Sequence, residues 1–183
     1  MADGYARVTG KPGVVVCDSD TSGTNTITGL QTANMDSAPI VVFICHFSED
    51  DKLSNVFNQI DHIGISRSTT KHNFLVEDVM DLSRIVREAL YLSVTGRPGA
   101  ILVDIPKHVL FSEYKFNFPK IDKVSGYSIP KEAKVSDINK AANLIMKAKR
   151  PIVFGGGGIV ISGATEELQN FANRLKIPVT LTL

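Results

Sequence analysis

The sequence predicts an α/β fold, namely a doubly wound parallel sheet followed by the first βαβ unit of a second α/β domain. Three observations support this prediction. Short apolar runs recur along the chain, and each is apolar at consecutive positions, as in a strand buried on both faces. Stretches with helical periodicity separate these runs. A proline-containing stretch without periodicity then interrupts the alternation before it resumes.

The first elements follow from local signals. Residues 1–9 predict the last turns of a helix that stops at Gly10. The apolar run Val14 to Cys17 predicts a buried strand. Small and polar residues at 19–25 then lead into a helical stretch at residues 26–35.

The next elements repeat the alternation. They are a strand from Ile40 to Ile44, a short helix around residues 60–67, a short strand from Phe74 to Val76, a long helix from Asp78 or Asp81 to Val94, and a strand from Ala100 to Ile105. Apolar residues recur at three- and four-residue spacing along one face of the long helix, so we expect that face to cover the sheet.

The alternation of strands and helices stops in the stretch from Phe111 to Lys134. This predicts three regions: residues 1–117 as a first domain, 118–134 as a linker and 135–183 as the start of a second domain. The second domain contains a further set of elements. They are a helix capped by Ser136, a strand from Ile152 to Phe154, a glycine run from Gly155 to Gly158, a helix from Ala164 to Leu175, and a strand from Val179 to Leu183.

Composition excludes several classes of protein. The chain has 183 residues, 43% of them hydrophobic, and a formal net charge of +1, which gives no electrostatic reason to expect nucleic acid or a membrane surface as a partner. The sequence shows no membrane-spanning run and no secretory leader. Cys17 and Cys45 have neither a disulfide framework nor a metal spacing, so we expect two buried thiols and a cytoplasmic location.

The glycine run is the one local motif that suggests a ligand. It follows a strand and precedes a helix, so its backbone N–H groups could approach a phosphate. It does not match the G-x-G-x-x-G pattern, and a simple tight turn explains it equally well. The four histidines share no ligand spacing, so the sequence predicts no metal site.

Several strings, in order and with matching gaps, resemble the acetolactate synthase catalytic subunits, a family of thiamine diphosphate enzymes. They are Met1-Ala-Asp-Gly-Tyr-Ala-Arg7, Gly10-Lys-Pro-Gly13, Asn25-Thr-Ile-Thr-Gly29, Met35-Asp-Ser37, Asp61-His-Ile-Gly-Ile-Ser-Arg67, Lys71-His-Asn-Phe74, Gly96-Arg-Pro-Gly99, Val103-Asp-Ile-Pro-Lys107, Arg150-Pro151 and Ile161-Ser-Gly163. The resemblance covers essentially the whole chain.

This resemblance implies the pyrimidine-binding domain of the family and the start of its FAD-binding domain. It implies thiamine diphosphate, FAD and Mg²⁺ as cofactors, and the condensation of two pyruvates, or of pyruvate with another 2-oxo acid, to an acetohydroxy acid and carbon dioxide. By resemblance, the cofactor-binding residues are Asn25, Arg97, Gly156 and Gly157, and the substrate-channel residues are Phe57, Asn58 and Lys107.

The chain also departs from the family pattern. The catalytic glutamate of the family corresponds to a position before Met1, so no catalytic residue is assigned here, and the third domain with its magnesium ligands has no counterpart. The loop usually written S-G-P-G-A-T-N reads Ser19-Asp-Thr-Ser-Gly-Thr-Asn25, and the channel glutamine is Asn58. These departures predict a fragment that does not turn over by itself.

Three alternatives stay open at this point. The chain could be a non-catalytic module that associates with a full-length catalytic subunit. It could be a general FAD- or nucleotide-binding protein, or belong to a related thiamine decarboxylase or oxidase. By resemblance, we expect a homodimer or association with a full-length catalytic subunit and a regulatory small subunit.

Overall fold

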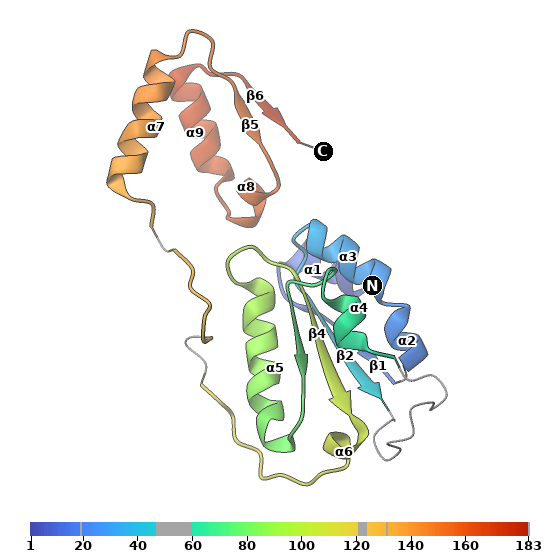
Figure 1. Cartoon of the computed structure of the whole chain (residues 1–183). Coiled ribbons are helices and arrows are strands. Elements are labelled where there is room, and N and C mark those ends of the chain that lie inside the picture. The colour runs from blue at the N-terminus through green and yellow to red at the C-terminus, as the bar shows by residue number, and fades with distance from the viewer. Residues whose placement is uncertain (19, 47–59, 121–123, 131, 183) are drawn as a thin grey trace. The chain divides into compact units, whose positions relative to one another are not determined.

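The computed structural model describes residues 1–18, 20–46, 60–120, 124–130 and 132–182 (Figure 1). The chain divides into two compact units, Met1–Ile129 and Pro130–Leu183. The boundary between them lies at Ile129 and Pro130.

A four-stranded parallel sheet forms the centre of the first unit. Its strands are β1 (Gly13–Cys17), β2 (Ile40–His46), β3 (His72–Leu75) and β4 (Ala100–Pro106), in the order β1-β2-β4-β3. All seven residues of β4 are buried. Because every strand runs in the same direction, all four carboxyl ends meet at one edge of the sheet and all four amino ends at the other.

Helices cover both faces of this sheet, which confirms the doubly wound prediction (Figure 1). On one face, α1 (Ala2–Thr9), α3 (Ile27–Met35) and α4 (His62–Ser66) pack on the strands. On the other face lies α5 (Val79–Val94), with the short α6 (Lys107–Leu110) beside it. The sheet thus separates two apolar layers, and open parallel sheets of this kind bind ligands at the carboxyl ends of their strands.

The ends of two helices agree with the local signals. The side chain of Asp78 accepts a hydrogen bond from the Met80 N–H at 2.8 Å, which caps α5. Gly10 ends α1 with φ 67°, a left-handed conformation that glycine adopts without strain. The sequence did not predict α2 (Asp20–Thr24), which occupies the small and polar stretch after β1.

The prediction that every strand is buried on both faces is wrong for β1. Val14 and Val16 are 52% and 68% exposed, whereas Cys17 on the opposite face is buried. The reason is tertiary: α5 packs on β2, β3 and β4, and β1 is the edge strand on the side away from it. An apolar stretch of sequence therefore forms a strand with one covered and one open face.

The second unit contains a βαβ arrangement, as predicted. Strands β5 (Val153–Gly155) and β6 (Val179–Leu181) are parallel, with Val153 opposite Val179, and α8 (Gly158–Ile161) and α9 (Thr165–Leu175) connect them. They are preceded by α7 (Val135–Lys147), whose N-cap is Lys134 without a side-chain cap, so the predicted Ser136 cap is wrong.

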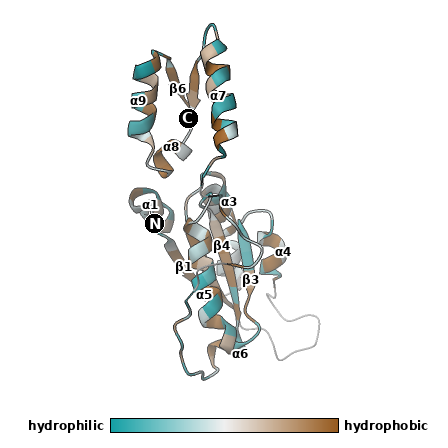
Figure 2. Ribbon diagram, turned by 90° about the vertical axis from the view of Figure 1, so that its left-hand side faces the viewer, coloured by the Kyte–Doolittle hydropathy of each residue, from teal (hydrophilic) through white to brown (hydrophobic). Residues whose placement is uncertain are grey.

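Helices α7 and α9 have no buried residue. Figure 2 shows apolar and polar residues alternating along α7, and its Leu144 and Met146 are 72% and 74% exposed. Among the helices of the described residues, none combines the length and the apolar character needed to cross a bilayer.

Part of the stretch that the sequence assigns to a linker packs on the first unit. Val124 and Tyr127 lie against the apolar layer of α5. The Tyr127 ring meets the Tyr91 ring of α5 edge-on, with 6.5 Å between ring centroids. These contacts attach the residues before the boundary to the sheet domain.

Candidate functional site

The carboxyl edge of the first sheet holds two of the residues that the sequence singles out. Asn25 is exposed and lies between α2 and α3, directly after the segment that leaves β1. Lys107 is exposed and begins α6, immediately after β4. Open parallel sheets bind ligands at this edge, because loops diverge there from neighbouring strands. Phe57 and Asn58, the other two channel residues, lie outside the described residues.

Buried polar side chains lie just beneath this edge. His62 of α4 and Asp104 of β4 are 1% and 5% exposed. Asp104 is the register partner of Ile44, so both point to the face covered by α3 and α4. The sequence analysis gave no role to either residue, and only their buried position in the structure draws attention to them.

Gly23 explains how the loop after β1 reaches this buried layer. A Cβ atom on Gly23 would lie 2.7 Å from His62 Cε1 and 2.9 Å from Ile44 Cδ1, both of them buried side chains. A glycine is therefore required for α2 to approach the sheet so closely. Gly23 of the altered Ser19–Asn25 loop, which stands where the family pattern has alanine, thus has a packing role.

The two thiols lie at the carboxyl ends of their strands, and both are free. Burial raises the pKa of the Cys17 thiol above its usual value, although a hydrogen bond with Ser22 lowers it slightly. Burial also raises the pKa of Cys45, with smaller contributions from Cys17 and Asp104. Both shifts favour the protonated thiol at neutral pH.

Arg97 lies at the opposite, amino edge of the sheet, in the turn that precedes β4. Its Nε donates to Ser37 Oγ at 2.8 Å, and its Nη2 donates to the Met35 carbonyl at 2.8 Å. Both partners belong to the end of α3 and the residues just after it. The guanidinium is thus exposed but held in one orientation, which differs from a freely solvated arginine on a turn.

The sequence-predicted site residues of the first unit are therefore in two places. Asn25 and Lys107 lie at the carboxyl edge, and Arg97 lies at the amino edge. Strand β4 connects the two edges, and the six steps between its seven residues, at about 3.3 Å each, separate them by about 20 Å. One small ligand cannot contact both groups.

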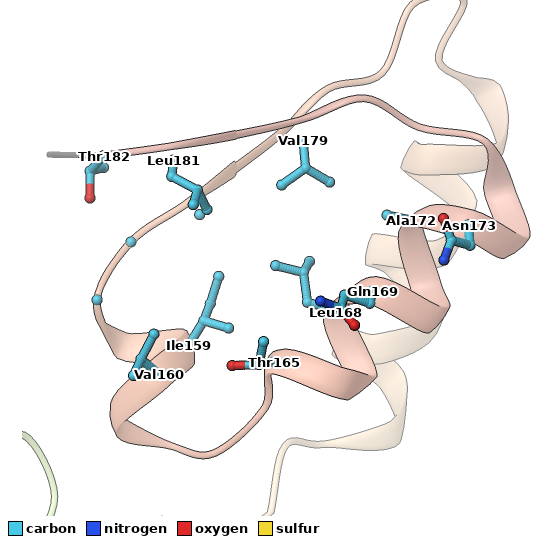
Figure 3. Close-up of a pocket in the computed structure, with 13 residues that line it drawn as sticks. Ile159, Val160, Thr165, Leu168, Gln169, Ala172, Asn173, Val179, Leu181 and Thr182 are labelled. Atoms are coloured by element: carbon cyan, nitrogen blue, oxygen red, sulfur yellow. The ribbon is translucent and has the colours of Figure 1, made fainter. Parts of the chain in front are cut away.

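The glycine run lies in the second unit and opens onto a pocket of about 530 Å³ (Figure 3). Gly155, Gly156 and Gly157 line one part of it. The remaining lining is mostly apolar, with a few neutral polar groups: Ile159, Val160, Thr165, Leu168, Gln169, Ala172, Asn173, Val179, Leu181 and Thr182. With no lysine or arginine in this lining, the pocket suits an uncharged or aromatic group better than a phosphate.

The glycines themselves differ in how much space surrounds them. A Cβ on Gly155 would lie 2.6 Å from Ile159 Cδ1, so this glycine is needed for internal packing. A Cβ on Gly157 would meet no atom within 4 Å, so the surface there is open to an external ligand. Across the residues that the structure describes, no group of three histidine, cysteine, aspartate or glutamate side chains is arranged to hold a metal ion.

Two family models match the chain. The description "Thiamine pyrophosphate enzyme, N-terminal TPP binding domain" matches residues 1–65, and "Thiamine pyrophosphate enzyme, central domain" matches residues 138–183. The first match includes β1, β2 and Asn25, and the second includes the glycine run. Both domain types thus occur in the expected order.

The chain is similar over its whole length to acetolactate synthases of several bacteria. The acetolactate synthase large subunit of Buchnera aphidicola subsp. Schizaphis graminum is 43% identical over 100% of this chain and 32% of its own length. That of Haemophilus influenzae is 39% identical over 100% of this chain and 32% of its own length. The acetolactate synthase of Mycobacterium leprae is 41% identical over 100% of this chain and 29% of its own.

The chain thus spans about a third of the length of the curated relatives it matches. The ordered strings described above are part of a likeness that extends from the first residue to the last, and the resemblance predicted from them is confirmed. The chain belongs to the family of thiamine pyrophosphate enzymes that includes the acetolactate synthase large subunits.

Proposed function

We propose that these residues form the pyrimidine-binding domain, and the opening part of the flavin-binding domain, of an acetolactate synthase. The reaction joins two pyruvates, or pyruvate and another 2-oxo acid, and releases carbon dioxide. The observation that carries the proposal is the 43% identity to an acetolactate synthase large subunit over 100% of this chain. We assign residues 1–117 to the first domain, 118–134 to the linker and 135–183 to the second domain.

The carboxyl edge is the proposed thiamine side. Thiamine diphosphate, when bound, supplies a centre that stabilises the carbanion formed on decarboxylation. The amide of Asn25 can both donate and accept hydrogen bonds, which fits an aminopyrimidine ring. Lys107 is exposed at the same edge and would attract the carboxylate of a 2-oxo acid. By resemblance, Phe57 and Asn58 also belong to the proposed substrate channel.

Two surfaces, one in each unit, are separately proposed to bind flavin: the amino edge of the first unit and the glycine run of the second. The guanidinium of Arg97 is exposed and oriented, and its unused N–H groups fit an anionic part of FAD. Gly156 and Gly157 border a pocket whose uncharged lining fits the ring portion of a nucleotide. The donors and the open surface at Gly157 are therefore compatible with the cofactor that the resemblance implies.

Magnesium and the proton-transferring glutamate enter the proposal through the resemblance alone. By resemblance, their positions correspond to parts of the synthase outside these 183 residues. We therefore expect no acetolactate from the 183-residue polypeptide incubated alone with pyruvate, thiamine diphosphate, Mg²⁺ and FAD. Product from this polypeptide would refute that expectation.

A hybrid enzyme tests the proposed function. In it, this chain replaces the matching third of the Haemophilus influenzae large subunit, and acetolactate is measured after acid conversion to acetoin. A second hybrid keeps the parent's own residues in place of 19–25, which separates a defect of that loop from a wrong assignment. Acetolactate from either hybrid supports the proposal. Two hybrids that assemble like the parent and bind FAD, yet form no product, contradict it.

Association is part of the same proposal. By resemblance to the acetolactate synthase large subunits, we expect this chain to pair with a second copy or with a full-length catalytic subunit and a regulatory small subunit. Gel filtration of the two hybrids, with the parent as standard, measures this. Monomeric hybrids that retain activity would count against the pairing.

A further inference from the structure

We propose that Lys71 and Tyr127 are positioning residues for Arg97: they hold its turn through the backbone and so preset the guanidinium for an anionic ligand. The inference rests on the proposed role of Arg97 in flavin binding. It assigns a function to a lysine and a tyrosine that are 56 residues apart and share no motif.

Lys71 binds carbonyl groups of the turn with its side chain, while its own backbone is held by the sheet. Its backbone N–H donates to the Ala100 carbonyl at 2.8 Å, which ties it to the first residue of β4. Its ammonium group donates to the carbonyls of Leu92, Thr95 and Arg97 at 2.6, 2.7 and 2.9 Å. A cation at this position satisfies carbonyls at the carboxyl end of α5, where the helix dipole favours positive charge. The ammonium group of Lys71 therefore binds carbonyls at the end of α5 and also holds the backbone carbonyl of Arg97.

Tyr127 closes the arrangement from the stretch just before the unit boundary. Its hydroxyl donates to the Thr95 carbonyl at 2.8 Å and accepts from the Lys71 ammonium at 3.1 Å. Its ring centroid lies 5.1 Å from the same ammonium, within the range of a cation–π contact. The tyrosine thus orders both the lysine and the carbonyl that the lysine binds.

The turn is packed too closely to move independently of these residues. Gly96 has φ 59°, and a Cβ there would lie 2.6 Å from the Tyr127 hydroxyl oxygen. A Cβ on Gly99 would lie 3.2 Å from Lys71 Cβ and 2.8 Å from Asn34 Oδ1. Both glycines are therefore needed for the turn to lie against its neighbours.

Arg97 is consequently fixed at both ends. Lys71 holds its carbonyl, while Ser37 and the Met35 carbonyl hold its guanidinium. The two side-chain bonds use two of the five N–H groups of arginine, and the exposed guanidinium retains donors for a ligand. An orientation fixed before binding lowers the entropy lost on binding, so loosening the turn weakens affinity without removing any ligand contact.

The experiment compares Lys71→Met and Tyr127→Phe with the control Lys115→Met, which changes an exposed lysine elsewhere in the same unit. Hydrogen exchange of the 183-residue chain is followed by mass spectrometry in peptides covering residues 93–99 and, as an internal reference, residues 2–9. We expect at least tenfold faster exchange at 93–99 in Lys71→Met, a smaller increase in Tyr127→Phe, and no change in the control. Unchanged exchange in Lys71→Met overturns the inference.

A titration with FAD, followed by flavin fluorescence, separates positioning from a general loss of structure. We expect Lys71→Met to weaken FAD binding about tenfold, and to have no further effect once Arg97→Ala is present, because it acts only through Arg97. An equal loss in the Arg97→Ala background overturns the inference. If the unmodified chain binds no FAD, or Arg97→Ala leaves binding unchanged, the flavin part of the proposed function fails, and the exchange measurement still decides whether Lys71 and Tyr127 hold the turn.

Discussion

The same substitution, glycine to alanine, should have opposite effects at two helical positions of the first unit. At Gly23 in α2, the new Cβ would lie 2.7 Å from His62 Cε1 and 2.9 Å from Ile44 Cδ1. At Gly29 in α3, it would meet no atom within 4 Å. Both residues are in helices, so alanine favours the helical backbone at both.

The magnitudes follow from these two surroundings. Overpacking a buried site costs about 1–3 kcal/mol, and His62 and Ile44 are 1% and 0% exposed, so neither side chain has open space to move into. The gain in helix propensity offsets up to about 1 kcal/mol of that cost. We therefore expect Gly23→Ala to lower the free energy of unfolding by about 1–2 kcal/mol. Gly29→Ala should raise it by about 0.5–1 kcal/mol.

Tyrosine fluorescence during urea unfolding measures the stability of the first unit alone, and so compares the two glycine variants there. The sequence contains four tyrosines and no tryptophan, and Tyr5, Tyr91, Tyr114 and Tyr127 all lie in the unit Met1–Ile129. At a slope of about 2 kcal/mol per molar urea, Gly23→Ala should lower the midpoint by about 0.5–1 M. A midpoint for Gly23→Ala at or above that of the unmodified chain would refute the packing argument, and so would a shift of the same sign in both variants.

Two further predictions concern stability. Asp78→Ala removes the side chain that accepts from the Met80 N–H and should lower the free energy of unfolding by about 1 kcal/mol, measured by the same urea titration; an unchanged midpoint would show that this cap contributes nothing. Burial raises the pKa of Cys17 and Cys45 above about 9.0, so the folded chain binds more protons than the unfolded chain at alkaline pH. The two protonated thiols therefore contribute to the free energy of unfolding in full below about pH 9.0, and this contribution is lost as pH rises through their folded-state pKa. In a double Cys→Ala variant, the free energy of unfolding should consequently fall less steeply above about pH 9.0. Equal slopes in the two proteins would contradict this.

Features encoded by neighbouring residues could be predicted from the sequence. Asp78 as a helix cap and Gly10 as a helix stop depend on atoms a few residues away, and the structure contains both. Apolar runs located the strands, because a strand buried in a parallel sheet has apolar residues at consecutive positions. Ser136 shows the limit of such signals, because a capping residue type also occurs inside the first turn of a helix.

Features that depend on distant parts of the chain could not be predicted. The exposure of Val14 and Val16 depends on which strands α5 covers, and no property of β1 encodes that. The same holds for the candidate site. Arg97 was identified by resemblance, but the contact of Lys71 with Tyr127 requires the fold to bring two ordinary residues together. The separation of Asn25 and Arg97 to opposite edges likewise became visible only from the sheet order.

The length of β4 has a consequence for how this sequence can diverge. A strand of seven buried residues keeps the loops at its two ends about 20 Å apart, so a substitution in a loop at one end has no direct contact with the turn at the other. The pattern at residues 19–25 can therefore change without direct loss of a contact around Arg97. This sequence has that combination, because it departs from the family pattern at 19–25 and matches it at Gly96-Arg-Pro-Gly99.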